Sequence, residues 1–281
     1  MCDGMGRFLI SGIQFDRSSH GNWGDTLATI KEERYARIRD GLARSGVIKV
    51  EDVSDMLGIS WATVRRDFAE LERRGWLRRT HGGAVSTDPS FESTYSDKLM
   101  DSIMEKRQIG AAAAALIPDG SVIGCTGGTT VMHVIQALRG RSMTIVTNAI
   151  NIAMEMAKDE TAQVVVAGGT LRPKSYELVG HFAEQLISSF HLDIALVGVD
   201  GISMERGIST HTIAEAHTAA LYIAQADSVW VVADHTKAGK NAPAIIAPLG
   251  SIKHLVTDRQ FPKDLLDAFT AAGLKVTIAE E

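Results

Sequence analysis

The chain has 281 residues, of which 45% are hydrophobic and 22% charged, values that exclude a fibre or a wholly disordered protein. Its length predicts two folded units joined by a linker. No apolar run approaches the roughly 20 residues that cross a bilayer, and no signal sequence begins the chain. The two cysteines, Cys2 and Cys125, are too few for a disulfide framework, so we expect a cytoplasmic protein with no membrane attachment.

The formal net charge of −5 is unevenly distributed along the chain. Residues 30–85 hold 12 Lys and Arg against 9 Asp and Glu, so the acidic excess lies entirely in the remainder. A basic segment in an otherwise acidic chain is typical of a nucleic-acid-binding module.

The first elements are a tail and a helix. Residues 1–29 show no helical or strand period, and we expect them to form a mobile tail. From residue 31 to residue 44, apolar residues recur at helical spacing, and Gly46 ends the run. This pattern predicts a first helix whose inner face is Tyr35, Ile38 and Leu42.

Two more helices and a hairpin follow. A short extended stretch over 47–50 precedes a helix with the expected inner residues Val53, Met56 and Leu57, which Gly58 ends. Ser60 is a candidate cap for a third helix with Val64, Phe68 and Leu71 on its inner face. A basic hairpin over 76–85 completes a predicted winged helix-turn-helix over residues 30–85.

The third helix is the predicted DNA reader, because its solvent side carries basic and hydroxyl side chains that suit the major groove. The predicted DNA-contacting residues, in this helix and the hairpin, are Ser60, Trp61, Thr63, Arg65, Arg66, Arg78, Arg79 and His81. A plainer alternative is that these side chains cap the helix or form a solvated basic face. The order of helices, turn and basic hairpin favours DNA binding over that alternative.

Residues 86–104 are predicted to be a linker and connecting helix, and residues 105–281 a second domain. Apolar, partly β-branched runs alternate there with helical stretches at 122–125, 143–146, 164–167, 194–199, 229–232 and 254–256. Strands that alternate with helices predict right-handed crossovers and a mostly parallel sheet. The fold class is therefore α/β with a Rossmann-like C-terminal domain.

Ligands of open parallel sheets bind at the carboxyl ends of the strands. The first run is followed by Thr126, Gly127, Gly128, Thr129 and Thr130 and then by a helix, which suits a phosphate cradle. The alternative is a glycine-rich turn in which Thr129 or Thr130 caps the helix. No Walker or dinucleotide motif is present.

Other strand ends offer further candidates. Asn148 and Gly169 can contact a ligand or only shape a turn. Asp200 and Glu215 can accept bonds from sugar hydroxyls or pair with neighbouring cations, and Lys237 can neutralise a phosphate or remain a surface charge. We expect these residues to converge around a phosphorylated metabolite.

The motifs resemble those of the DeoR family of bacterial regulators over roughly residues 32–258. The matching stretches are Glu33-Arg34, Thr63–Asp67, Arg79–Val85, and then GGTT, TN, GG, Asp-Gly and Asp-x-Thr-Lys. The resemblance implies a winged helix-turn-helix joined to a sensor domain similar in fold to ribose-5-phosphate isomerase, with phosphorylated sugars as effectors. It carries the ligand role to Gly128, Thr129, Thr130, Asn148, Gly169 and Lys237.

Two positions depart from the family pattern. Thr126 stands where the family usually has Asp, and Ala219 stands where a Lys commonly follows Glu-Ala by three residues. Both changes alter the charge of the pocket, and Arg172 or Lys174 is a candidate to compensate.

The expected protein is a regulator, with a repressor of a sugar-catabolism operon as the leading hypothesis. It would bind a double-stranded DNA operator as a homo-oligomer, a dimer or a tetramer, because paired half-sites multiply specificity. A phosphorylated metabolite would release it, and no cofactor or catalytic residue is expected.

Three alternatives remain open. The first is a sugar-phosphate isomerase-like enzyme that uses Asp200, Glu215 and Lys237 as acid and base. The second is a metal site at His211, Glu215 and His217. The third is a DNA-binding scaffold whose second domain binds no effector.

Overall fold

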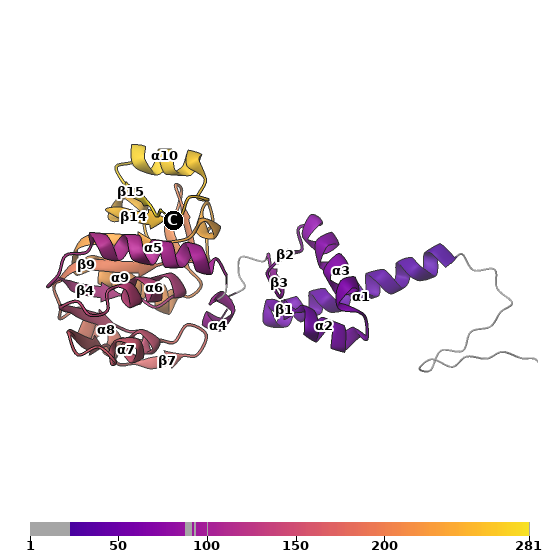
Figure 1. The fold of residues 1–281 in the computed structure, drawn as a ribbon, viewed down its shortest axis with the longest axis horizontal. Coiled ribbons are helices and arrows are strands. Elements are labelled where there is room, and N and C mark those ends of the chain that lie inside the picture. The colour runs from indigo at the N-terminus through magenta and orange to yellow at the C-terminus, as the bar shows by residue number, and fades with distance from the viewer. Residues whose placement is uncertain (1–22, 88–91, 93, 100, 281) are drawn as a thin grey trace, which may run out of the picture. The chain divides into compact units, whose positions relative to one another are not determined.

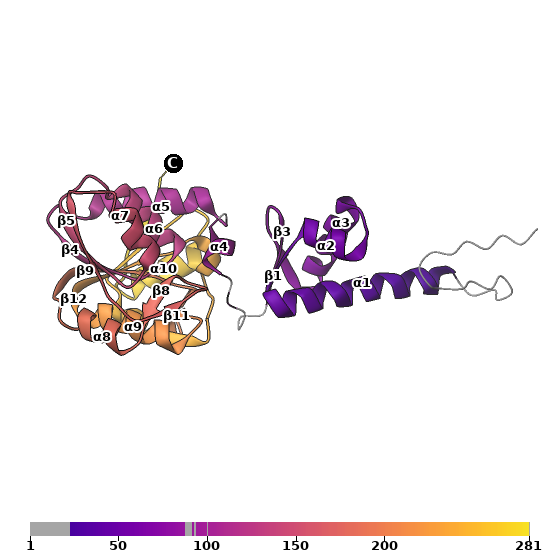
Figure 2. The same ribbon diagram turned by 90° about the horizontal axis from the view of Figure 1, so that it is seen from below.

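The computed structural model describes residues 23–87, 92, 94–99 and 101–280. The chain divides into two compact units, an N-terminal unit that ends at Val85 and a C-terminal unit that begins at Ser86. Figure 1 labels the elements of both units, and Figure 2 shows the same ribbon from below.

The N-terminal unit has three helices and a small sheet. Its elements are α1 (Trp23–Ser45), β1 (Val47–Lys49), α2 (Val50–Leu57), α3 (Trp61–Arg73), β2 (Leu77–Arg79) and β3 (Gly83–Ser86). β3 lies between β1 and β2 and pairs with β1 in antiparallel register, Val47 opposite Val85. This is the predicted order of helix, helix, turn, helix and hairpin.

The core of this unit is built from the expected helical stripes. Tyr35, Ile38 and Leu42 of α1 are buried together with Val64, Phe68 and Leu71 of α3. Residues three and four apart share one face of a helix, which is why these stripes meet. The inner face predicted for α3 is therefore confirmed.

Two expectations for this unit are wrong. The helix α1 begins at Trp23, so residues 23–29 are not part of a tail; residues 25–30 contain neither Gly nor Pro, and a helix can extend beyond its amphipathic stripe where no breaker stops it. Residues 1–22 of the expected tail lie outside the described residues. Met56 is 42% exposed, because the eight-residue helix α2 turns only a narrow face inward, with Val50 and Val53 buried.

The C-terminal unit is built on a seven-stranded parallel sheet. In spatial order the strands are β15 (Lys275–Ile278), β14 (His254–Thr257), β12 (Ala226–Val232), β9 (Leu192–Gly198), β4 (Val122–Cys125), β5 (Met143–Thr147) and β6 (Ala162–Val166). Every pairing in it is parallel. The predicted α/β fold class is confirmed, although β15 was not predicted.

Smaller elements surround this sheet. The helices are α4 (Tyr95–Lys98), α5 (Ile103–Leu116), α6 (Thr129–Ala137), α7 (Ile150–Met156), α8 (His181–Ile187), α9 (Ile213–Ala224) and α10 (Lys263–Ala271), with 3-10 turns η1 (His235–Lys237) and η2 (Leu249–Ser251). A hairpin joins β7 (Thr170–Arg172) to β8 (Glu177–Val179), and a second sheet has the order β10 (Gly201–Ser203), β11 (Gly207–Thr210) and β13 (Ala244–Ala247). These short strands were also not predicted.

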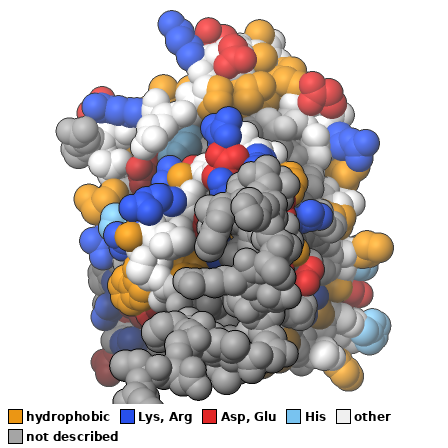
Figure 3. Space-filling model, turned by 90° about the vertical axis from the view of Figure 1, so that its right-hand side faces the viewer, with side chains coloured by type: hydrophobic (Ala, Val, Ile, Leu, Met, Phe, Trp, Pro, Cys, Tyr) orange, Lys and Arg blue, Asp and Glu red, His pale blue; other side chains and the backbone are white. Residues whose placement is uncertain are grey.

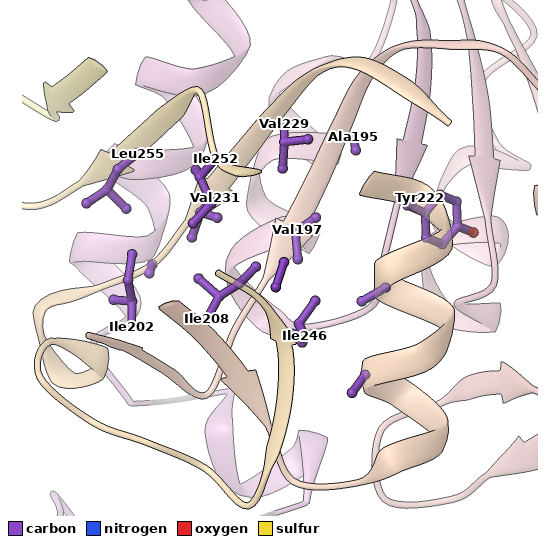
Figure 4. Packing of buried hydrophobic residues seen from close by; sticks show 14 of the residues in the cluster. Ala195, Val197, Ile202, Ile208, Tyr222, Val229, Val231, Ile246, Ile252 and Leu255 are labelled. Atoms are coloured by element: carbon purple, nitrogen blue, oxygen red, sulfur yellow. The ribbon is translucent and has the colours of Figure 1, made fainter. Parts of the chain in front are cut away.

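Both faces of the parallel sheet are buried. Along β9, Ile194 and Leu196 belong to one apolar cluster and Ala195 and Val197 to the other. Successive side chains of a strand point to opposite faces, so a sheet covered on both sides needs continuous apolar strands. Figure 4 shows the second cluster, in which α9 and the small sheet pack on Ala195 and Val197.

Candidate functional site

The local geometry at the start of α3 follows from two residues. Gly58 adopts a left-handed conformation that ends α2, and Ser60 then caps α3 by accepting a hydrogen bond from the backbone N–H of Thr63. Trp61 is 53% exposed, so the first turn of α3 presents a large side chain to solvent.

The arginines of α3 fall into two groups. Arg73 and Arg74, in or beside its last turn, pair with Glu70 at 2.6 and 3.0 Å. Arg65 and Arg66, in its first half, are exposed and take part in no ion pair with any described residue. Unpaired guanidinium groups are available to phosphates and base edges.

The hairpin adds a second basic group of residues next to α3. A small hollow is lined by Arg65 and Phe68 of α3 and by Arg79, Thr80 and His81 of the hairpin. Arg78 and His81 are exposed, but Arg79 is held by Glu72, whose Oε2 accepts a hydrogen bond from Nε at 2.6 Å. On the face drawn in Figure 3, Lys and Arg side chains lie among acidic and apolar ones.

The orientation of α3 is fixed by a partly buried ion pair. Asp67 is 3% exposed, and its two oxygens accept hydrogen bonds from Nε and Nη2 of Arg34 at 2.8 and 2.9 Å. This bidentate contact joins α3 to α1 and leaves Arg66 on the solvent side.

A second candidate site lies in the C-terminal unit, where the strand order reverses. From β4 the chain moves to β5 and β6 on one side, whereas β9, β12, β14 and β15 lie on the other. The carboxyl ends of β4 and β9 therefore flank a topological switch point, the usual ligand position of an open α/β sheet. A cleft opens there, which we call the strand-end cleft.

The strand-end cleft brings together most of the residues predicted to bind an effector. The predicted residues that line it are Thr126, Gly127, Gly128, Thr129, Thr130, Lys174, Asp200, Glu215 and Lys237. Gly128 stands at the cap position of α6, and no side chain in the described part of the chain caps this helix. The alternative that Thr129 or Thr130 acts as the cap is therefore wrong, and the first-turn N–H groups of α6 remain available to an anion.

Asp200 pairs with two lysines of the strand-end cleft. Its Oδ1 lies 2.6 Å from Nζ of Lys98 and 4.0 Å from Nζ of Lys237. Burial alone would raise the pKa of Asp200, but these two lysines outweigh it, and the pKa falls well below its usual range. One carboxylate thus holds two lysines in the cleft that the glycine-rich loop after β4 also lines.

Arg172 lies outside the lining of the strand-end cleft and pairs with two of the carboxylates that line it. Its Nη2 donates to Glu92 at 2.6 Å and its Nε donates to Glu215 at 3.1 Å. The guanidinium therefore compensates two cleft carboxylates rather than lining the cleft itself.

Glu177 is the least compensated carboxyl of the strand-end cleft. It is 8% exposed, accepts a hydrogen bond from the N–H of Gly127 and lies in hydrogen-bonding contact with Glu215. Burial, followed by the charge of Glu215, raises the pKa of Glu177 to about 8. A Cβ at position 127 would lie 2.8 Å from Glu177, so glycine is needed for this approach.

Two other predicted residues lie outside the lining of the strand-end cleft. Asn148 is 1% exposed, and its Nδ2 donates to the carbonyl of Leu178 at 3.1 Å, which ties the end of β5 to β8. Gly169 packs against the same hairpin, where a Cβ would meet the carbonyl of Val179 at 2.6 Å. Both residues position the hairpin that carries Glu177.

Sequence reasoning missed four groups of the strand-end cleft. Glu92, Tyr95 and Lys98 come from the segment predicted as a linker, which belongs to the C-terminal unit, and Glu177 comes from the unpredicted hairpin. The capping box of Thr94 and Asp97 was a readable signal for α4. The long-range bond from the N–H of Tyr95 to the carbonyl of Lys174 had no local signal.

The metal alternative finds no support in the geometry. His211 approaches Asp200 at 3.8 Å, whereas His217 contacts Glu184 at 3.1 Å, so the two histidines face different partners. The residues that the structure describes include no metal-binding cluster of three or more His, Cys, Asp or Glu. Within the same residues, no helix has the length and apolar character to span a membrane.

Comparison with known protein families assigns both units. Residues 34–90 match the DeoR-like helix-turn-helix domain, and residues 101–259 match the DeoR C-terminal sensor domain. Among solved structures, ribose 5-phosphate isomerase A from Methanocaldococcus jannaschii covers 47% of this chain and 53% of its own, with 17% identity and a TM-score of 0.36. That partial similarity carries no argument about function.

Relatives match nearly the whole chain. A putative aga operon transcriptional repressor of Escherichia coli O157:H7 is 32% identical over 92% of this chain and 97% of its own length. The transcriptional regulator GlpR of Haloferax volcanii is 35% identical over 87% and 96%, and the repressor GlcR of Bacillus subtilis is 33% identical over 89% and 97%. These relatives are regulators, which supports that interpretation over the isomerase alternative. The chain belongs to the DeoR family of DNA-binding transcription regulators.

Proposed function

We propose that this protein represses a sugar-catabolism operon and that a phosphorylated sugar, or a related metabolite, bound in the strand-end cleft controls its affinity for DNA. The names of relatives support this proposal: one is the aga operon repressor described above, and another is the glycerol-3-phosphate regulon repressor of Escherichia coli K12, 29% identical over 85% of this chain and 95% of its own.

The convergence of anion-binding groups in the strand-end cleft carries the effector proposal. The uncapped N-terminus of α6 lies in the same cleft as Lys98 and Lys237, which Asp200 holds in place. Backbone N–H groups and the helix dipole favour a phosphate there, and two lysines supply the opposite charge. The carboxylates that line the same cleft can accept hydrogen bonds from sugar hydroxyls.

DNA recognition is proposed for α3 and the hairpin. Thr63, Arg65 and Arg66 would enter the major groove, Ser60 and Trp61 would lie at its edge, and Arg78, Arg79 and His81 would contact phosphates. Arg79 is paired with Glu72, so it must either break this ion pair or contact a phosphate while still paired. We therefore expect Arg78 to contribute more to DNA binding than Arg79.

The proposed assembly is a homo-oligomer, at least a dimer, that acts in the cytoplasm. A single short recognition helix offers few base contacts, and two half-sites multiply its specificity. An effector can change DNA affinity only by binding one arrangement of the recognition helices more tightly than another. A phosphorylated intermediate of the controlled pathway would then release the repressor from its operator DNA.

The first test is fluorescence anisotropy of labelled DNA from upstream of this protein's gene, with and without sugar phosphates at fixed salt. Arg66→Ala should weaken DNA binding roughly 5-fold to 150-fold, the range for a base or phosphate contact, and leave effector binding unchanged. Arg73→Ala is the matched control, because Glu70 already pairs with Arg73.

Lys237→Ala should have the opposite effect, with DNA affinity retained and the response to effector lost. Lys263→Ala, at an exposed position on α10, is its control. Equal damage to both activities by Arg66→Ala and by Lys237→Ala would contradict the division of roles. If the protein binds DNA tightly but no sugar phosphate changes its affinity, the DNA-binding regulator would stand and the proposed effector would be wrong.

A further inference from the structure

The chain that follows the N-terminal unit forms part of the wall of the strand-end cleft. Only residues 86–91 separate Val85, the end of the N-terminal unit, from Glu92, which lines the cleft. Tyr95 and Lys98 of α4 line the same cleft. We call Glu92 and residues 94–99 the α4 segment. A ligand in the cleft therefore lies against the part of the chain that leads directly to the DNA-binding unit.

The middle of the α4 segment is held by the hairpin of β7 and β8. The backbone N–H of Tyr95 donates to the carbonyl of Lys174 at 2.6 Å. The ring of Tyr95 packs on the ring of Tyr176, with 5.3 Å between their centroids. Tyr95 is 8% exposed, whereas Tyr176 lies outside the lining of the cleft. Tyr176 therefore supports the wall of the cleft without being part of its surface.

Ion pairs hold both ends of the α4 segment. Glu92 accepts a hydrogen bond from Nη2 of Arg172 at 2.6 Å, and Nε of the same guanidinium donates to Glu215. At the other end, Nζ of Lys98 donates to Oδ1 of Asp200 at 2.6 Å. All of these residues except Arg172 line the cleft, so a ligand there lies against the attachments of the α4 segment.

The α4 segment depends on these contacts for its structure. The helix α4 has only four residues, and a single helical turn is unstable in water by itself because helix formation has a costly nucleus. The residues that hold it, Arg172, Lys174, Tyr176 and Asp200, lie outside the strands of the parallel sheet. The α4 segment can therefore leave the cleft wall while the sheet stays folded.

We propose that the α4 segment transmits occupancy of the strand-end cleft to the N-terminal unit: the effector binds more tightly when the segment is held by the hairpin, and operator DNA binds more tightly when it is released. This inference rests on the proposed function, because it specifies how the same cleft regulates DNA binding. A ligand that contacts Tyr95 and Lys98 as well as the strand ends loses contacts when the segment leaves.

Release of the α4 segment adds its residues to the connection between the two units. A longer connection lets the two recognition helices of an oligomer reach two half-sites of the operator. Effector and DNA thus oppose each other through one equilibrium, and linkage makes the opposition reciprocal.

Hydrogen exchange of the full chain, measured by mass spectrometry over residues 94–99, tests the proposal without knowledge of the effector. Saturating operator DNA is expected to speed the exchange of these amides at least about 5-fold, the lower end of typical coupling between two sites. Residues 263–271 of α10, none of which lines the cleft, are the control. If operator DNA leaves exchange over residues 94–99 unchanged, the inference is wrong.

A variant that weakens the attachment should strengthen DNA binding. Tyr176 has a φ of 60°, in the left-handed region that asparagine tolerates better than most residues, so Tyr176→Asn keeps the turn and removes the ring that supports Tyr95. It should bind labelled operator DNA about 2-fold to 12-fold more tightly than the wild type, the range for an aromatic pair. Leu171→Asn, at an exposed position on the same hairpin, is the matched control. Equal DNA affinity of the two variants would also overturn the inference.

Sugar phosphates separate this inference from the proposed effector. Of glucose 6-phosphate, galactose 6-phosphate and further sugar phosphates, any compound that releases operator DNA should slow exchange over residues 94–99 about 10-fold at ten times its Kd. Release of DNA without slower exchange would overturn the inference and leave the sugar-phosphate regulator standing. If no sugar phosphate binds while DNA still speeds exchange, the role of the α4 segment in DNA binding stands and the proposed effector is wrong.

Discussion

Replacement of Asp67 by alanine should destabilise the N-terminal unit by about 2 kcal/mol. The Asp67 carboxylate accepts two hydrogen bonds from Arg34, and hydrogen bonds to charged groups contribute roughly 1.5–3 kcal/mol each. The Arg34 side chain is 21% exposed, so water solvates it once its partner is lost, and the expected effect is below the sum of the two bonds. The orientation of α3 relative to α1 should loosen with the loss of this contact.

Calorimetry of the full chain measures this effect. For a unit of this size each kcal/mol moves the unfolding midpoint by about 4–8 °C, so the midpoint of the N-terminal unit should fall by about 8–16 °C. Asp40→Ala, at an exposed carboxylate on α1, should change stability by no more than about 0.5 kcal/mol. A midpoint for Asp67→Ala within about 3 °C of the wild type would refute the reasoning, as would an equal shift in the transition of the C-terminal unit.

Three further outcomes are expected. Gly83→Ala should unfold the small N-terminal sheet, since its Cβ would lie 2.2 Å from the carbonyl oxygen of Ile48, and circular dichroism with DNA binding would report the loss. Lys98→Met should destabilise the C-terminal unit by about 2 kcal/mol, because it removes the nearer cation from the half-buried Asp200. Asp200→Asn in the same chain should restore much of the lost stability, as measured by calorimetry. The pKa of Glu177 rises on folding from 4.5 to about 8, so the folded state holds the extra proton and stability should fall as pH rises through that window; thermal scans of Glu177→Gln should show a smaller fall.

Local sequence signals were sufficient wherever the structure depends on neighbours in the chain. The helical spacing of Val64, Phe68 and Leu71 placed the inner face of α3, and Ser60 marked its start. Six strands of the parallel sheet were visible as apolar runs, because a strand buried on both faces is apolar at nearly every position. The glycine-rich loop after β4 was also recognisable, because its residues are contiguous in the sequence.

Other features had no local signal. Lys98 lies 102 residues from Asp200, and only the packing of α4 against the hairpin brings the two together. Glu177 stands in a three-residue strand with no periodicity to reveal it, and its proximity to Gly127 depends on the hairpin folding over the end of β4. Arg172 was predicted as an effector-binding residue, but its contacts with Glu92 and Glu215 place it behind the strand-end cleft.

The sequence by itself determined the order of the elements, the inner face of α3 and its exposed arginines, the parallel sheet and the family. These depend on period, capping and contiguous motifs, which act over a few residues. Only the tertiary structure decided which carboxyl groups of the strand-end cleft have a counter-charge, since the ion pairs there join residues that are distant in the chain. The charge balance of the strand-end cleft follows from that three-dimensional pairing.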